Sequence, residues 1–125
     1  MERFLIVVGA GGLGSGARYL IALAAGDKTG EHIPYGTLIV NIVGSFLIAL
    51  VLELALRVKS LPPNLSLAIS TGFMGGFTTY SSFNFQTTAL ALNGHHAKAA
   101  VNLIVTVVGC IAAGLVGIWL ARRLA

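Results

Sequence analysis

The 125-residue chain carries very little charge. Only 10% of its residues are charged, eight of them basic and four acidic, whereas 56% are hydrophobic. Its mean hydropathy is +0.89. A soluble domain of this size covers its surface with far more charge. The composition therefore excludes a water-soluble globular fold and indicates a single domain, spanning residues 1–125, that is embedded in a membrane.

Residues that support covalent or metal chemistry are also scarce. Cys110 is the single cysteine, which excludes an internal disulfide framework and a thiolate metal cluster. The sequence offers no membrane-facing pair of carboxylates and no activated nucleophile. We therefore expect that the chain is not an enzyme, and we expect no nucleic-acid partner.

Four apolar runs account for most of the chain. Each has about the 20 residues that a helix needs to cross roughly 30 Å of hydrocarbon. Because lipid offers the backbone no hydrogen-bond partners, helices are the expected form. The sequence predicts an all-α integral membrane protein with four transmembrane helices, over approximately residues 4–25, 36–56, 65–92 and 97–120.

Basic residues lie on both sides of the predicted bundle, with only a modest excess on one side. An even number of spans puts both termini on the side of the loop near residues 57–64. That side carries Arg3, Arg57, Lys59, Arg122 and Arg123, and the other carries Lys28, Lys98 and Arg18. Because positive loop charge sets orientation, this weak contrast predicts either cytoplasmic termini or insertion both ways round. Insertion both ways would suit an antiparallel homodimer.

A small bundle also constrains where a transport path could lie. Four short helices fill their own centre with side chains, so a path would form more naturally between subunits. Glycines in the first span, around Gly12 and Gly16, have the small-xxx-small spacing that lets another helix approach closely. Trp119, near the end of the fourth span, is typical of a membrane-interface anchor.

The third run contains an unusual stretch, "TGFMGGFTTYSSFNFQT", over residues 71–87. Gly75 and Gly76 each cost about 1 kcal/mol relative to alanine in a helix, and four serine or threonine residues follow within six positions. We predict that the helix breaks at this point, in mid-membrane. Irregular backbone at that depth persists only inside protein or beside a watery cavity. The carbonyls of one half-helix could hold a small cation, and the N–H groups of the other favour an anion.

Polar side chains in the other runs could line the same cavity. Asn41 and Ser45 lie one helical turn apart, and an amide supplies two donors without net charge. Thr106 and Cys110 continue a polar stripe that begins at Asn102. Phe83 could present the electropositive edge of its ring to an anion. Each of these residues also has a structural interpretation, as a helix-packing or self-bonding side chain.

Two charged residues fall inside apolar runs. Arg18 either extends its side chain to the membrane surface or draws anions into a vestibule, and the residues alone leave both open. Glu53 lies four residues before Arg57, so we expect an ion pair at the interface rather than proton coupling.

Taken together, these residues resemble the Fluc family of fluoride channels, also called CrcB proteins. The likeness covers the whole chain and is carried by "GTLIVNIVGSF" at residues 36–46 and "TGFMGGFTTYSSF" at residues 71–83. The resemblance implies a fluoride-selective channel that lowers toxic cytoplasmic fluoride. It also implies an antiparallel dual-topology homodimer with two pores, a multi-pass location in the cell inner (plasma) membrane, and a structural Na⁺ at the dimer centre.

Motif matching assigns roles to individual positions. The Na⁺ ligands would be the backbone carbonyls of Gly75 and Thr78 in each subunit. The fluoride pathway would include residues from all four spans: Arg18, Asn41, Tyr80, Ser81, Ser82, Phe83, Thr106 and Cys110. Two positions depart from the family. Tyr80 stands where the family usually has a phenylalanine. Gln86 stands where many members carry an acidic residue. We expect both differences to affect the rate at which fluoride is conducted.

The expected mechanism is passive conduction. Fluoride is tightly hydrated, so neutral donors and ring edges must replace its water while still allowing release. Two other functions remain open from the sequence. A small multidrug-resistance-type proton-coupled exporter would need an acidic residue in the middle of the first span, which is absent. A non-transporting membrane assembly subunit would explain the glycines but not the row of hydroxyls.

Overall fold

The computed structural model describes residues 1–58 and 61–125, and every regular element in these ranges is helical. Lys59, one of the basic residues counted on the side of the termini, lies outside the described residues. The elements are α1 (Glu2–Ala25), α2 (Tyr35–Arg57), α3 (Pro63–Leu67), the π-helix η1 (Ala68–Met74), α4 (Gly75–Phe77), α5 (Tyr80–Leu92) and α6 (His96–Leu124).

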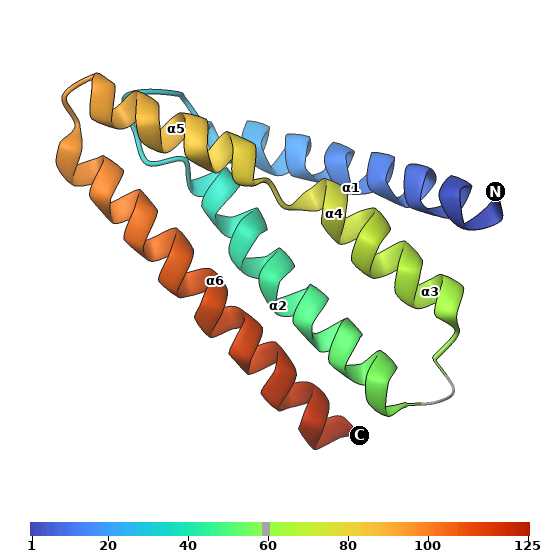
Figure 1. Ribbon diagram of the computed structural model, residues 1–125. Helices are drawn as coiled ribbons and strands as arrows, with labels where there is room; N and C mark the ends of the chain where they lie inside the picture. Colours follow the sequence, from blue (N-terminus) through green and yellow to red (C-terminus); the bar gives the residue numbers. More distant parts are fainter. Residues whose placement is uncertain (59–60) are drawn as a thin grey trace.

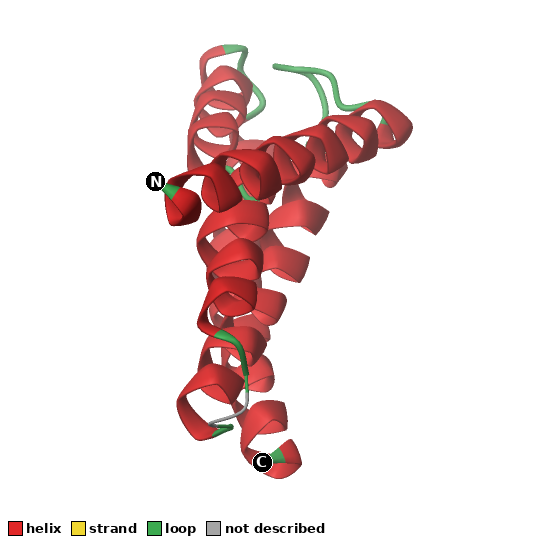
Figure 2. Ribbon diagram, turned by 90° about the vertical axis from the view of Figure 1, so that its right-hand side faces the viewer, coloured by secondary structure: helices red, strands yellow, loops and turns green. Residues whose placement is uncertain are grey.

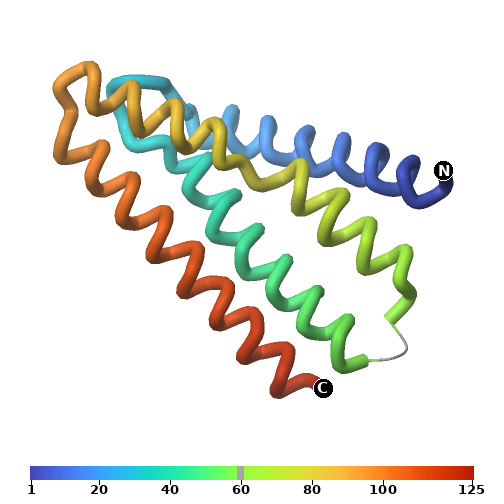
Figure 3. The backbone as a smooth tube through the Cα atoms, viewed as in Figure 1, coloured from blue at the N-terminus to red at the C-terminus, as the bar shows by residue number. Residues whose placement is uncertain are grey.

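These elements form four helical units, the third of which consists of α3, η1, α4 and α5 in succession (Figure 1). Consecutive units run in opposite directions, so α2 and α6 run parallel to each other. Both chain ends lie toward the same end of the molecule as the end of α2 and the start of α3, where α1 and α6 diverge (Figure 3). Figure 2 shows the same arrangement from that end. α6 packs against α2 and α5, and α1 packs against α2, η1 and α4.

Three of the helices are long and apolar enough to cross a membrane by length and composition. Within the described residues these are α1, α2 and α6. The buried apolar core is small and centres on Val40, Met74 and Phe77. Large apolar side chains such as Leu13, at 71% exposure, cover the outside instead. This inside-out distribution fits a chain whose surroundings are lipid.

Local polar contacts fix where the first two helices end and begin. α1 ends at Ala25, because the left-handed backbone of the following residue, Gly26 (φ 66°), terminates the helix. The Asp27 carboxylate then accepts hydrogen bonds from the backbone N–H groups of Gly36 (2.8 Å) and Thr37 (3.0 Å). Asp27 therefore supplies partners to N–H groups that the first turn of α2 leaves unpaired, with a negative charge at the positive end of the helix.

Glycines bring α1 and the third unit into backbone contact. A Cβ added at Gly14 would overlap the carbonyl of Phe73, and one added at Gly76 would overlap the carbonyl of Gly11. Around Gly12 and Gly16, by contrast, a Cβ would meet nothing within 4 Å. One face of α1 therefore packs against the third unit. The face with Gly12 and Gly16, whose spacing predicts close helix packing, is open.

The glycine pair of the third unit is helical, which differs from the predicted position of the helix break. Gly75 has φ −60° and ψ −37°, and α4 continues to Phe77. The residues that depart from helical geometry are Thr78 (ψ 155°) and Thr79 (φ −151°, ψ 111°). Glycine permits a break but does not impose one, and at Gly76 its small size serves the contact with α1.

Candidate functional site

The two extended residues that separate α4 from α5 are held by the side chain of Asn41. The Asn41 amide donates from Nδ2 to the Thr79 carbonyl (3.0 Å) and accepts at Oδ1 from the Thr79 N–H (2.8 Å). Asn41 is only 8% exposed. One side chain thus satisfies both backbone groups of a residue that has left the helical hydrogen-bond pattern. We call this pair of contacts the Asn41–Thr79 clamp.

Thr79 also starts α5. Its Oγ1 accepts from the backbone N–H of Ser82 (3.1 Å), which is the hydrogen bond of an N-cap residue. The same oxygen lies 3.2 Å from Ser81 Oγ. Thr79 is not among the site residues predicted from the sequence, although a Thr directly before a helical segment is a local signal of an N-cap.

Because of these contacts, the backbone carbonyls of Gly75 and Thr78 do not receive the hydrogen bonds that they would accept in a continuous helix. The N–H that would pair with the Gly75 carbonyl belongs to Thr79, and it donates to Asn41 instead. The N–H that would pair with the Thr78 carbonyl belongs to Ser82, and it donates to Thr79 Oγ1 instead. The two carbonyls assigned to Na⁺ by motif matching are therefore both deprived of their helical donors. Carbonyl oxygens of this kind are suitable ligands for a hard cation.

Arg18 contacts the helical segment that precedes the interruption. Its Nε donates to the carbonyl of Gly76 (3.1 Å), and Ser15 Oγ lies within 3.4 Å of the same oxygen. A cationic side chain at the carboxyl end of a helical segment is electrostatically favourable. The contact links α1 to the end of α4. Arg18 is not among the residues that line the groove described next.

A groove of about 340 Å³ opens beside the clamp, between α2, α5 and α6. We call it the α2–α5–α6 groove. Its lining combines hydroxyl and amide groups with aromatic and aliphatic side chains: Asn41, Ser45, Thr78, Thr79, Tyr80, Phe83, Thr106, Val107, Cys110 and Ile111. The fold thus brings together five of the eight predicted pathway residues, from three helices far apart in sequence. Ser81 and Ser82 lie near Thr79 without lining the groove.

Two aromatic rings stand at the start of α5. Phe83 is buried, with 5% exposure, whereas Tyr80 is 78% exposed. Their ring centroids are 5.7 Å apart with an interplanar angle of 62°, which is an edge-to-face arrangement. A ring edge is electropositive, so the pair combines an apolar wall with weak attraction for an anion.

Next to the groove, α5 and α6 carry buried polar atoms that have no hydrogen-bond partner. Among the described residues, Thr106 Oγ1, Asn102 Oδ1 and Gln86 Oε1 are buried and make no hydrogen bond. Asn102 Nδ2 does donate to Thr87 Oγ1 (2.8 Å). Buried polar groups are normally paired, so these atoms are places where a water molecule or a small polar ligand would gain hydrogen bonds.

Comparison with known proteins decides the family. The model of the family described as CrcB-like protein, Camphor Resistance (CrcB), matches residues 5–118. The chain is 49% identical over 125 residues to a fluoride-specific ion channel FluC of Anaeromyxobacter dehalogenans, covering 100% of this chain and 99% of the relative. The chain belongs to the CrcB family.

Other CrcB relatives match along nearly their whole length. The chain is 42% identical over 124 residues to a FluC of Geobacter sp. strain M21, covering 99% of this chain and 100% of the relative. It is 44% identical over 124 residues to a FluC of Sorangium cellulosum, covering 99% of this chain and 98% of the relative. Both relatives are also named fluoride-specific ion channels. The resemblance identified from the sequence motifs is therefore confirmed.

A second cavity in this CrcB chain contains none of the predicted site residues. It has a volume of about 400 Å³ and lies where the end of α2 meets the start of the third unit, lined by Arg3, Ala55, Leu61, Pro63, Ser66, Leu67 and Ser70. It is larger than the α2–α5–α6 groove but lies away from the interruption at Thr78 and Thr79. We therefore place the candidate functional site at the groove and the clamp.

Proposed function

We propose that this chain is a channel that conducts fluoride passively across the cell inner membrane and so lowers cytoplasmic fluoride. The carrying observation is the α2–α5–α6 groove, whose described lining residues include several neutral hydrogen-bond donors and none with a charge. The relatives' name, fluoride-specific ion channel, supports the same function. A channel is not an enzyme, which agrees with the expectation from composition.

Neutral donors suit an ion that must be both bound and released. Asn41 has two amide hydrogens, and the clamp uses one of them for the Thr79 carbonyl. The second amide hydrogen of Asn41 is available to replace one water molecule of a hydrated fluoride ion, and so is the hydroxyl hydrogen of Thr106. The edge of the Phe83 ring adds a weak attraction for the anion. A fixed positive charge would bind the anion more tightly and slow its release. We propose that Tyr80 and Cys110 complete this path, with Ser81, Ser82 and Arg18 at its approach.

The membrane topology is a further part of the proposal. We infer that residues 63–92 form a third span, interrupted at Thr78 and Thr79 in the middle of the membrane, and that two copies insert in opposite orientations as a homodimer. The exposure of Tyr80 and the open face at Gly12 and Gly16 support a partner surface. A two-fold antiparallel pair would give two equivalent pathways.

We further propose that Na⁺ has a structural role between the two copies. The Gly75 and Thr78 carbonyls of each copy would hold it, which the loss of their helical donors to Asn41 and Thr79 supports. When bound, the ion supplies positive charge that neutralises the carbonyl dipoles at the interruption. The Arg18 guanidinium already serves the neighbouring Gly76 carbonyl, so that oxygen is not part of the proposed ligand set.

Efflux from liposomes tests the function. Purified protein reconstituted with fluoride inside should release it passively, while vesicles loaded with chloride should retain their anion because the proposed channel is selective for fluoride. Phe83→Ile, which removes the ring edge but keeps an apolar side chain, should lower fluoride efflux at least about fivefold. Uptake of a lipophilic cation driven by a proton gradient, with no fluoride release, would favour the exporter instead. Release of neither ion would favour the assembly subunit.

A further inference from the structure

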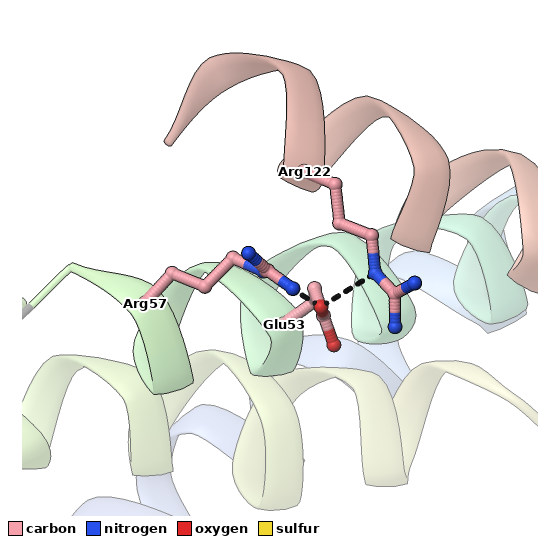
Figure 4. Close-up of polar contacts among 3 residues, drawn as sticks. All are labelled: Glu53, Arg57 and Arg122. Carbon is pink, nitrogen blue, oxygen red and sulfur yellow. Dashed lines mark hydrogen bonds and ion pairs between the residues drawn. The ribbon is translucent and has the colours of Figure 1, made fainter.

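Three charged side chains form a cluster where α2 and α6 end (Figure 4). Glu53 Oε1 accepts from Nε of Arg57 (2.8 Å) and from Nε of Arg122 (2.9 Å). The ion pair predicted between Glu53 and Arg57 is confirmed, and Arg122 joins it from 69 residues along the chain. One carboxylate oxygen thus holds two guanidinium groups side by side, although they repel each other.

The two arginines remain open to an additional anion. The Glu53 side chain is only 14% exposed, whereas those of Arg57 and Arg122 are 42% and 59% exposed. Each guanidinium has five N–H donors and uses Nε for Glu53. Figure 4 shows the two terminal nitrogens of Arg122 on the side away from Glu53. The cluster keeps a net positive charge, because two cations share one carboxylate.

The surroundings of the cluster place it at the membrane surface. α2 and α6, which end here, are both long and apolar enough to span a membrane. Near the end of α6, the Arg123 guanidinium lies 5.4 Å from the centroid of the Trp119 ring. Trp119 is 56% exposed, and exposed tryptophans concentrate at the level of lipid headgroups. The free donors of the cluster therefore meet headgroups rather than acyl chains.

We propose that Arg57 and Arg122, aligned by Glu53, bind the phosphate of an anionic lipid headgroup. Guanidinium groups pair with phosphate oxygens through two parallel hydrogen bonds, which a single ammonium group cannot reproduce. An anionic lipid is favoured over a zwitterionic one because the cluster has unbalanced positive charge and the zwitterion carries its own cation. This site is separate from the α2–α5–α6 groove and does not depend on what the groove conducts.

Native mass spectrometry of the full chain in detergent tests the proposal. The probes are phosphatidylglycerol, phosphatidylcholine and inorganic phosphate. The wild type should retain phosphatidylglycerol at least about fivefold better than phosphatidylcholine. Arg122→Gln should lower phosphatidylglycerol retention at least about fivefold, and so should Arg57→Gln, which provides a second variant should the first fail to fold. Lys98→Gln, which removes one positive charge at the opposite end of the molecule, is the control and should retain the lipid.

Arg122→Lys separates a shaped site from general attraction. The substitution preserves the positive charge but replaces the planar guanidinium group and its paired N–H donors by an ammonium group. The proposal therefore predicts reduced retention of phosphatidylglycerol. Retention equal to that of the wild type would mean that charge alone attracts the lipid, and would overturn the proposal. Equal retention of the two lipids would overturn it too. Displacement of the lipid by low concentrations of inorganic phosphate would assign the site to free phosphate instead.

Discussion

Replacing Asn41 by alanine should disrupt the interruption between α4 and α5. The substitution removes both hydrogen bonds of the Asn41–Thr79 clamp. An unpaired buried backbone group costs about 1–3 kcal/mol, so losing partners for both groups of Thr79 costs about 2–6 kcal/mol. Water admitted to the groove would bring the cost toward the lower value. Against a total stability of about 5–15 kcal/mol, this loss is large.

The assay combines unfolding in detergent with fluoride efflux from liposomes. Asn41→Ala should lower the unfolding midpoint clearly and should reduce efflux at least about tenfold, since each 1.4 kcal/mol against the extended conformation shifts the equilibrium between it and competing conformations tenfold. Asn41→Asp keeps the acceptor for the Thr79 N–H but loses the donor to its carbonyl, so its efflux should also fall.

Asn64→Ala provides the matched control. Its amide donates one exposed hydrogen bond, to Glu2 (3.0 Å), so the substitution should change stability by no more than about 0.5 kcal/mol. If Asn41→Ala behaved like Asn64→Ala in both unfolding and efflux, the clamp would not hold the interruption and our reasoning about Asn41 would be wrong.

Two further substitutions test how the third unit is held. Gly14→Ala should destabilise the protein by about 1–3 kcal/mol, because the new methyl group overlaps the Phe73 carbonyl and lies 2.9 Å from the Phe77 nitrogen. Gly114→Ala, where an added Cβ would come no closer than 3.9 Å to the Ser45 carbonyl oxygen, should be neutral or stabilising. Equal thermal unfolding midpoints for the two variants would contradict the packing. Thr79→Val removes the Oγ1 that caps α5 and should cost about 0.5–2 kcal/mol, whereas Thr79→Ser keeps the cap; identical unfolding curves would rule the cap out.

Local patterns in the sequence predicted much of the fold. The apolar runs indicated where helices lie, because hydrophobic length and helical hydrogen bonding are properties of each segment alone. The Glu53–Arg57 pair was also predictable, since residues four apart share a helix face. Arg122 was not, because its approach to Glu53 depends on how α6 lies against α2.

The site illustrates the same limit. Glycine composition suggested a break at Gly75 and Gly76, yet the extended residues are Thr78 and Thr79. Their position follows from a partner 38 residues away, since the Asn41 amide provides the hydrogen bonds that the helix would otherwise supply. The position of Asn41, Phe83 and Thr106 around one groove likewise depends on tertiary packing. Residue types and spacing suggested that these side chains share a site, but not where that site lies.

The most direct test of the conduction path uses Cys110. It is the single cysteine in the chain and lines the α2–α5–α6 groove, so a small thiol reagent such as methyl methanethiosulfonate adds its group at one place. We predict that modification lowers fluoride efflux from liposomes at least about fivefold, that a reductant restores it, and that efflux through Cys110→Ser does not respond to the reagent. Complete modification of Cys110, verified by mass spectrometry, with unchanged efflux would contradict a fluoride path through this groove.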